Sequence, residues 1–141
     1  MLKLRGRKIF QGQVEGEALV TAMGISFFGG VDPESGVVVE KGHELEGQCI
    51  SHKVLVFPTG KGSTVGSYTL YRLKKAGLAP AAIINAECET ITAVGCIIAE
   101  IPCVDRIPIE QLVTGAKVRV DGEAGTVEVI APLSPDYSRP V

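Results

Sequence analysis

The fold class of this chain is decided by one stretch, KVLVFPTGKGSTVGSYTLYRLKKAG, at residues 53–77. It opens with a near-continuous apolar run at 53–57, which is typical of a strand buried on both faces of a sheet. A glycine-rich loop follows, and Ser63 or Thr64 can then cap a helix that runs to about Lys75. Strand, loop and helix in this order predict half of a parallel βαβ unit.

The helix expected over 63–75 has one apolar face and a defined end. Gly66, Leu70, Leu73 and Gly77 are spaced so that they share this face. Two lysines near its end suit the negative end of the helix dipole, and Gly77 can stop the helix. We therefore expect this helix to pack against the strand that precedes it.

The pattern of strand and helix continues downstream, with a strand expected at 81–85, a helix at 89–100 and a strand at 101–104. The rest of the chain reads mainly as β-structure. The expected segments are strands at 3–10, 14–20, 37–39, 117–120 and 126–130, with one helical turn at 109–113. The prediction is a mixed α/β fold in which a β-rich half packs on a small parallel βαβ core.

The 141 residues suit a single domain spanning residues 1–141, and residues 132–141 are expected to form a loose tail. Apolar residues make up 45% of the chain and charged residues 21%, which is ordinary for a globular protein. The net charge of −2 argues against a nucleic-acid binder. No apolar run approaches the roughly 20 residues of a transmembrane helix, and no signal peptide is evident, so we expect a cytoplasmic protein without a membrane partner.

The spacing of the cysteines and histidines does not suit a metal site. These residues are Cys49, Cys88, Cys96, Cys103, His43 and His52. No two cysteines have C-x-x-C spacing, and neither histidine lies near a cysteine pair. We expect the cysteines to be small buried hydrophobic residues and no metal or cofactor to be held by this chain. The sequence leaves open a disulfide between two of them.

The loop at 59–67, TGKGSTVGS, has the composition of an anion site. A helix N-terminus presents unpaired N–H groups, glycines allow close approach, and Lys61 adds a full positive charge. The loop is not a P-loop, because Gly62 rather than Ser or Thr follows Lys61. A capped helix after a tight turn would show the same pattern, so this alternative stays open.

Ser63 is the candidate nucleophile or base in this loop. A Ser-His-Asp arrangement is weakly supported, because both histidines precede Ser63 and neither has a matching context. A serine activated without histidine needs a cation and oriented dipoles, which Lys61 and the helix N-terminus can supply. A second loop, Gly29-Gly30-Val31-Asp32, could bring a carboxylate to the same place, although such loops are more often simple turns.

Three stretches resemble the small subunit of the aconitase X group: FGGVDP at 28–33, VFPTGKGSTVGSY at 56–68 and PAAIIN at 80–85. The resemblance covers roughly residues 6–106. It is strongest to the archaeal-type branch of this group. It implies a swivelling β/β/α domain like the mobile domain of aconitases.

The resemblance also implies a function shared with a second chain. In that branch, the small subunit pairs with a large subunit carrying a 4Fe-4S cluster, as a heterodimer or higher assembly. The joint enzyme is a hydro-lyase of the mevalonate pathway to isoprenoids. It dehydrates (R)-5-phosphomevalonate, a small anionic hydroxy acid, to trans-anhydromevalonate 5-phosphate. By the same resemblance, the proton acceptor matches Ser63, and the chain is not expected to be active alone.

The remaining candidate residues would act around this serine. Lys61, Gly62 and Thr64 would hold substrate oxygens or orient Ser63. The other candidates are Gly29, Gly30 and Asp32, which would line the cleft facing the partner, and Asn85, which could bind substrate. For Asn85 a turn or cap role remains equally open.

Two other functions remain open on the sequence. The chain could be the small subunit of a cis-3-hydroxyproline dehydratase, since the substrate can be selected by the partner. It could also be a non-catalytic anion-binding module in which Ser63 only caps a helix. In that case Ser63→Ala would cost about 1 kcal/mol of stability and leave activity nearly unchanged.

Overall fold

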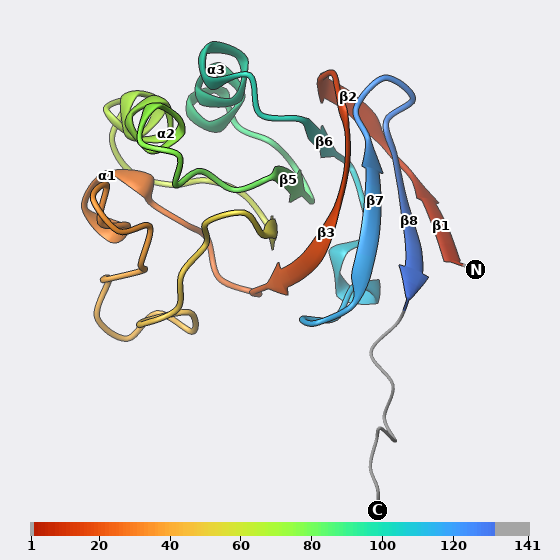
Figure 1. Cartoon of the computed structure of the whole chain (residues 1–141), viewed down its shortest axis with the longest axis horizontal. Helices are drawn as coiled ribbons and strands as arrows, with labels where there is room; N and C mark the ends of the chain where they lie inside the picture. The colour runs from red at the N-terminus through yellow and green to blue at the C-terminus, as the bar shows by residue number, and fades with distance from the viewer. Residues whose placement is uncertain (1, 132–141) are drawn as a thin grey trace, which may run out of the picture.

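The computed structural model describes residues 2–131, which contain eight strands and four helical segments. The strands are β1 (Leu2–Arg5), β2 (Arg7–Phe10), β3 (Gln13–Val20), β4 (Val54–Phe57), β5 (Ala82–Asn85), β6 (Cys103–Asp105), β7 (Lys117–Asp121) and β8 (Thr126–Ala131). The helical segments are α1 (Phe27–Gly30), α2 (Gly66–Lys75), α3 (Thr90–Ala99) and the 3₁₀ helix η1 (Ile109–Gln111). The strands form one sheet in the order β1-β8-β7-β3-β4-β5-β6-β2 (Figure 1).

The parallel core predicted from the sequence is confirmed. β3, β4, β5 and β6 pair in parallel in that order, and all four residues of β4 are buried. β3 also joins the two halves of the molecule. Its last residues pair with β4, while Gln13–Glu17 pair antiparallel with β7. The mixed α/β fold with a β-rich half therefore follows from one long strand that serves both halves.

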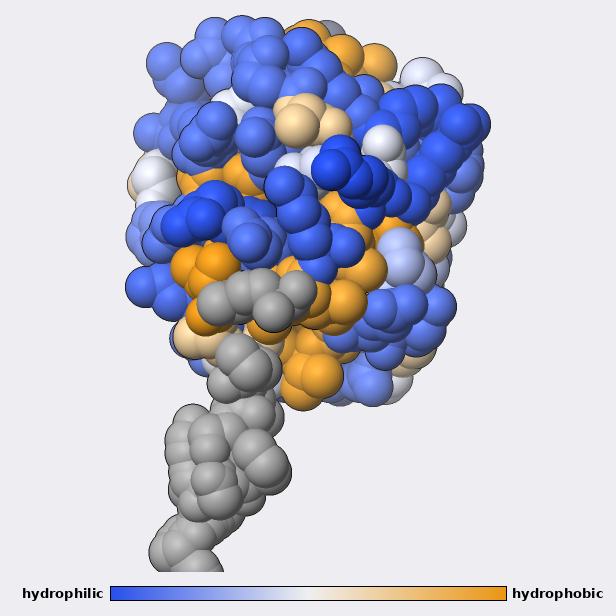
Figure 2. All heavy atoms as spheres, turned by 90° about the vertical axis from the view of Figure 1, so that its right-hand side faces the viewer, coloured by the Kyte–Doolittle hydropathy of each residue, from blue (hydrophilic) through white to orange (hydrophobic). Residues whose placement is uncertain are grey.

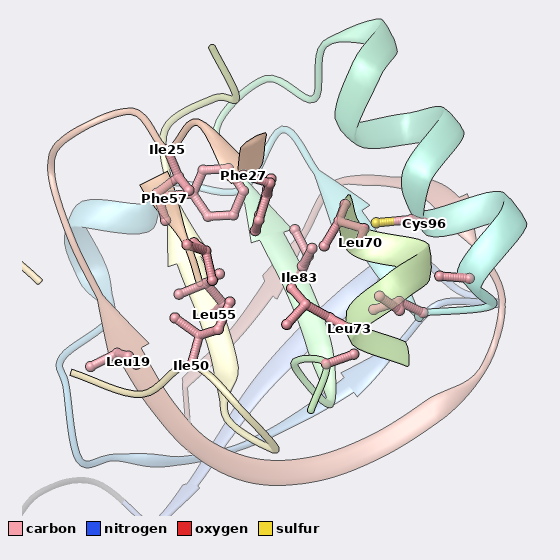
Figure 3. Close-up of a cluster of buried hydrophobic side chains, with 14 of the residues drawn as sticks. Leu19, Ile25, Phe27, Ile50, Leu55, Phe57, Leu70, Leu73, Ile83 and Cys96 are labelled. Carbon is pink, nitrogen blue, oxygen red and sulfur yellow. The ribbon is translucent and has the colours of Figure 1, made fainter. Parts of the chain in front are cut away.

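Alternating side chains of the central strands divide the core into two clusters. Leu55, Phe57 and Ile83 point to the side of the sheet that α2 and α3 cover (Figure 3). Val54 and Ile84 point to the opposite side, where they pack against residues of β7 and β8. This alternation is the two-residue period of a strand buried on both faces. The apolar face predicted for the first helix is confirmed by the complete burial of Leu70 and Leu73.

The strand predicted at 3–10 is two strands that lie at opposite edges of the sheet. β1 pairs with β8 and β2 pairs with β6, and Gly6 lies at the break between them. A Cβ atom on Gly6 would lie only 2.0 Å from the carbonyl oxygen of Asp105. The chain can cross between the two edges here because this residue has no side chain.

Other boundaries also differ from the predictions. The predicted strand at 37–39 makes only isolated bridges, Val31 to Val38 and Val37 to Cys49. α2 begins at Gly66 rather than at 63 or 64, and it has no side-chain cap. The predicted tail at 132–141 lies outside the described residues. No helix in the described part of the chain is long and apolar enough to cross a membrane.

Candidate active site

The loop between β4 and α2 is held by backbone hydrogen bonds to the segment around Ile25. The Lys61 N–H donates to the Ile25 carbonyl at 2.9 Å, and the Ile25 N–H donates to the Thr59 carbonyl at 3.3 Å. Gly60 lies against the start of α3, where a Cβ atom would lie 2.3 Å from Oε1 of Glu89 and from Oγ1 of Thr92. The loop is thus fixed between two neighbouring segments at the carboxyl end of β4.

A shallow pocket of about 340 Å³ lies beside this loop. Its lining residues are Ser26, Phe28, Gly29, Gly30, Glu40, Lys61 and Gly62. Gly62 has a φ of +98°, and a Cβ atom on it would lie 2.4 Å from Oγ of Ser26, so only glycine fits here without strain. The structure therefore brings the two glycine-rich loops, predicted separately from the sequence, to one place.

Ser63 is exposed on the turn that leads into α2. Its Oγ accepts a hydrogen bond from the Val65 N–H at 3.1 Å, and its carbonyl accepts one from the Gly66 N–H at 2.9 Å. Val65 occupies the N-cap position of α2, and no side chain caps the helix there. The prediction that Ser63 or Thr64 caps this helix is therefore wrong. The Val65 N–H thus donates to the hydroxyl oxygen itself, and such a donor favours a negatively charged form of that oxygen.

Lys61 has a partner that no sequence pattern indicated. Its Nζ lies 3.1 Å from Oε2 of Glu40, and both side chains are partly exposed. Glu40 belongs to a loop distant in sequence, which folds back so that the Val39 N–H donates to the Gly30 carbonyl at 2.9 Å. The ammonium group is therefore held at the pocket by a carboxylate, and it remains accessible to an anionic ligand.

Three of the predicted site residues lie elsewhere. The Asp32 carboxylate accepts hydrogen bonds from the Glu34 N–H at 3.0 Å and the Ser35 hydroxyl at 2.9 Å, which lower its pKa. Thr64 lies on a separate groove between α2 and α3. Asn85 is fully buried, and its Nδ2 donates to the Phe57 carbonyl at 3.0 Å. None of the three lines the pocket around Lys61, and Ser63, which directly follows Gly62 in the chain, does not line it either.

The cysteine thiols are free and belong mainly to the core. Cys96 and Cys103 are buried as predicted and Cys88 is half-buried, but Cys49 is exposed, so the prediction of a buried residue is wrong for Cys49. A hydrogen bond with Cys103, together with burial, raises the pKa of Cys88 above its usual range. Within residues 2–131, no three His, Cys, Asp or Glu side chains come together as a metal site.

A family model, described as the aconitase X swivel domain, matches residues 3–129. The chain belongs to this family. It is 54% identical over 129 residues to the phosphomevalonate dehydratase small subunit of Thermococcus kodakarensis, covering 92% of this chain and 97% of that protein. It is 56% identical over 134 residues to the protein of the same name from Methanosarcina acetivorans, covering 93% of each.

A solved structure supports the same assignment. The crystal structure of Thermococcus kodakaraensis aconitase X in its holo-form contains a chain that matches this one with a TM-score of 0.91 and 54% sequence identity. The match covers 92% of this chain and 99% of that chain. The resemblance and the swivel-domain fold expected from the sequence are thus confirmed.

Besides Glu40, two residues at the site of this aconitase X swivel domain were not predicted from the sequence, and only one of them has a local sequence signal. Glu89 accepts hydrogen bonds from the Ile91 and Thr92 N–H groups, at 2.8 and 2.7 Å, and so caps α3. An acidic residue directly before an apolar helix is a recognisable cap signal. Ser26, by contrast, contacts the pocket only because its loop pairs with a distant one, and no local pattern shows this.

A polar cluster at the end of β6 is separate from this pocket. Asp105 is fully buried and accepts two hydrogen bonds from Arg7, at 3.0 and 2.8 Å, and one from the Cys88 N–H at 2.8 Å. Burial raises the pKa of Asp105, but these hydrogen bonds outweigh it and hold the pKa below its ordinary value. This ion pair joins β2 to β6 and is structural.

Proposed function

We propose that this aconitase X swivel domain is the small subunit of a phosphomevalonate dehydratase and that Ser63 is the proton acceptor of the shared active site. The assignment of the enzyme rests on relatives of that name at 54% and 56% identity over nearly the whole chain. One geometric observation carries the assignment of the base. An exposed serine oxygen accepts a backbone N–H beside a lysine-bearing pocket.

The reaction is the loss of water from a hydroxy acid. The base takes a proton from the carbon next to the carboxylate of (R)-5-phosphomevalonate, and the electron pair of that C–H bond forms the new double bond. The hydroxyl group on the adjacent carbon leaves and is released as water. The product is trans-anhydromevalonate 5-phosphate. Such a proton is weakly acidic, so the reaction needs a strong base held in a suitable protonation state.

Ser63 meets this need through its local structure. A free serine hydroxyl is a poor base because its alkoxide is rarely populated, and the Val65 N–H stabilises that alkoxide by hydrogen bonding. Lys61 lies in the same loop, and its ammonium would bind an anionic oxygen of the substrate. Gly29, Gly30 and Gly62 contribute no side chains to the pocket wall, so the substrate can approach the backbone there.

The rest of the active site is proposed for a larger partner subunit. The name "small subunit" carried by the relatives implies such a partner. Among residues 2–131, Cys96 and Cys103 lie within the core, Cys88 packs against it, and no three ligating side chains come together, so these residues do not fit a cluster site. The 4Fe-4S cluster implied by the family resemblance is therefore proposed for the larger subunit, where it would act as a Lewis acid on the leaving hydroxyl.

The decisive experiment is a dehydratase assay on the complex. This chain is purified anaerobically with its larger subunit, and 5-phosphomevalonate and cis-3-hydroxyproline are supplied separately. We expect turnover of the first substrate and a fall of about 10²–10⁴ in kcat for Ser63→Ala, the range of one acid–base group. Ser51→Ala is the matched control, because its hydroxyl donates to the Leu78 carbonyl away from the pocket. Full activity of Ser63→Ala would leave Ser63 as a turn residue only, and turnover of hydroxyproline alone would reassign the substrate.

A further inference from the structure

The outward face of α3 is apolar and uncharged. No residue between Thr90 and Ala99 carries a charge. Val94, Ile97 and Ile98 expose 42%, 50% and 40% of their surface, respectively. Glu89, the nearest acidic side chain before the helix, is engaged in capping it. Nothing in the described part of this chain covers this face.

This face continues onto α2 and the Ser63 loop. Thr64, Ser67, Tyr68, Thr90, Ile91, Val94 and Ile98 line a groove of about 320 Å³ between the two helices. Tyr68 is 67% exposed, and Phe28 is 53% exposed. A Cβ atom on Gly66 would lie 3.4 Å from Cγ2 of Ile91 and 3.8 Å from the Phe28 nitrogen, so the two apolar regions meet at the start of α2. We call the exposed apolar residues of this region the α2–α3 patch; they are Phe28, Val65, Tyr68, Val94, Ile97 and Ile98.

The opposite side of the molecule has a different surface. Figure 2 shows the side on which β1 and β8 lie, and most of it is hydrophilic, with smaller hydrophobic areas between. Arg119 of β7 there pairs with Glu15 and Glu128. The exposed face of the sheet thus carries ion-paired side chains, as expected for a surface in water. A helix face without any charge is the surface expected at a protein interface.

We propose that the α2–α3 patch is the docking surface for the larger subunit. The inference rests on the proposed function, because that function requires a partner which completes the active site. Phe28 lines the pocket at Gly62, and Tyr68 lines the groove at Thr64, so patch residues lie next to both chain neighbours of Ser63. Docking here would enclose the Ser63 loop and exclude water from it. Tyr68 and Phe28 are suitable anchors, since aromatic side chains dominate interface energetics. The matching surface of the larger subunit would be apolar and free of charge around these two rings.

The test compares three substitutions in the complex. Val94→Glu and Ile98→Lys place charges of opposite sign on the patch, and Glu and Lys both favour helices. Val113→Glu is the matched control, because Val113 is 53% exposed and its neighbour Leu112 packs in the cluster on the other side of the sheet. Titration of each full chain with the larger subunit measures the Kd, and circular dichroism verifies folding. We expect Val94→Glu and Ile98→Lys to raise the Kd about tenfold or more, and Val113→Glu to leave it near that of the wild type.

Three results would overturn the proposal. The first is an unchanged Kd for both patch variants, and the second is an equal increase for Val113→Glu. The third is a wild-type chain that self-associates through the patch while its variants become monomeric and still bind the larger subunit normally. That result would assign the patch to a second copy of this chain. The Kd measurement does not use the substrate, so it is independent of whether the complex dehydrates 5-phosphomevalonate.

Discussion

Two ion pairs of this chain each join a basic residue to an acidic residue, but they differ in how far the carboxylate is exposed to solvent. Arg7 and Asp105 form a bidentate pair in which the carboxylate is fully buried and also accepts the Cys88 N–H. Lys61 and Glu40 form a single contact of 3.1 Å between two partly exposed side chains. The first pair joins β2 to β6, whereas the second lies at the mouth of the candidate active site.

The difference between the pairs separates structural charge from available charge. A buried carboxylate that loses its partner cannot be solvated, so Arg7 must stay paired with Asp105 for the fold to be stable. An exposed pair exchanges one partner for water at little cost, so Lys61 can leave Glu40 and bind an anionic substrate. The position of a charge relative to solvent, rather than its residue type, distinguishes a charge fixed in the fold from one that is free to bind an anion.

The largest expected effect on stability is that of breaking the buried pair. Asp105→Ala removes three hydrogen bonds and leaves the Cys88 N–H unpaired, so we expect a loss of about 3 kcal/mol in the free energy of unfolding. Urea denaturation of the full chain measures this loss. Glu15→Ala, which breaks the exposed pair with Arg119, is the control and should have a much smaller effect. Similar losses in the two variants would mean that burial does not distinguish these pairs.

A smaller effect is expected from the titration of Asp105. Its folded-state pKa lies below the value of an unfolded Asp, which is about 3.9. The stabilisation is therefore fully present above about pH 4 and is lost as the pH falls through the folded-state pKa. The difference in unfolding free energy between wild type and Asp105→Asn should stay constant from neutral pH to about pH 4 and then shrink. A difference that grows on acidification would mean that folding raises the pKa of Asp105 instead of lowering it.

The sequence predicted the parts of the fold that depend on local pattern. The buried strand β4, the apolar face of α2 and the strand β5 that follows this helix can all be recognised from residues close together in the chain. The parallel pairing of β4, β5 and β6 followed from the connection rules of βαβ units, whereas the parallel pairing of β3 with β4 was not predicted. Gly62 and Lys61 were predicted as site residues because a glycine-rich loop between strand and helix is itself a local signal, and both line the pocket beside that loop.

Features that depend on distant contacts were not predicted. The break at Gly6 arises because Asp105 of β6 and Gly125 of the turn before β8 approach it, and the Gly6 N–H donates to the Gly125 carbonyl at 2.8 Å. Glu40 reaches Lys61 only through the folding of its own loop. Asn85 looked available at the end of a strand, yet it is buried beneath the loop that follows β4. In each case a contact between segments far apart in the chain determines the environment of the residue.

The smallest effect on stability is expected for Lys61→Met, and it separates the two roles that this lysine can have. The pair with Glu40 is partly exposed, so its loss should change the free energy of unfolding by less than about 0.5 kcal/mol. If Lys61 binds an anionic oxygen of the substrate, KM for 5-phosphomevalonate should rise about tenfold while kcat changes little.

Steady-state kinetics of the complex provide the test, and Glu40→Gln is the control. This substitution keeps the lysine and removes its competitor, so KM should stay the same or fall. A fall in kcat with unchanged KM for Lys61→Met would instead mean that Lys61 acts on Ser63 rather than on the substrate. Unchanged KM and kcat would make Lys61–Glu40 a surface pair without a role in the reaction. The contrast with Arg7–Asp105 would then describe two structural pairs that differ only in burial.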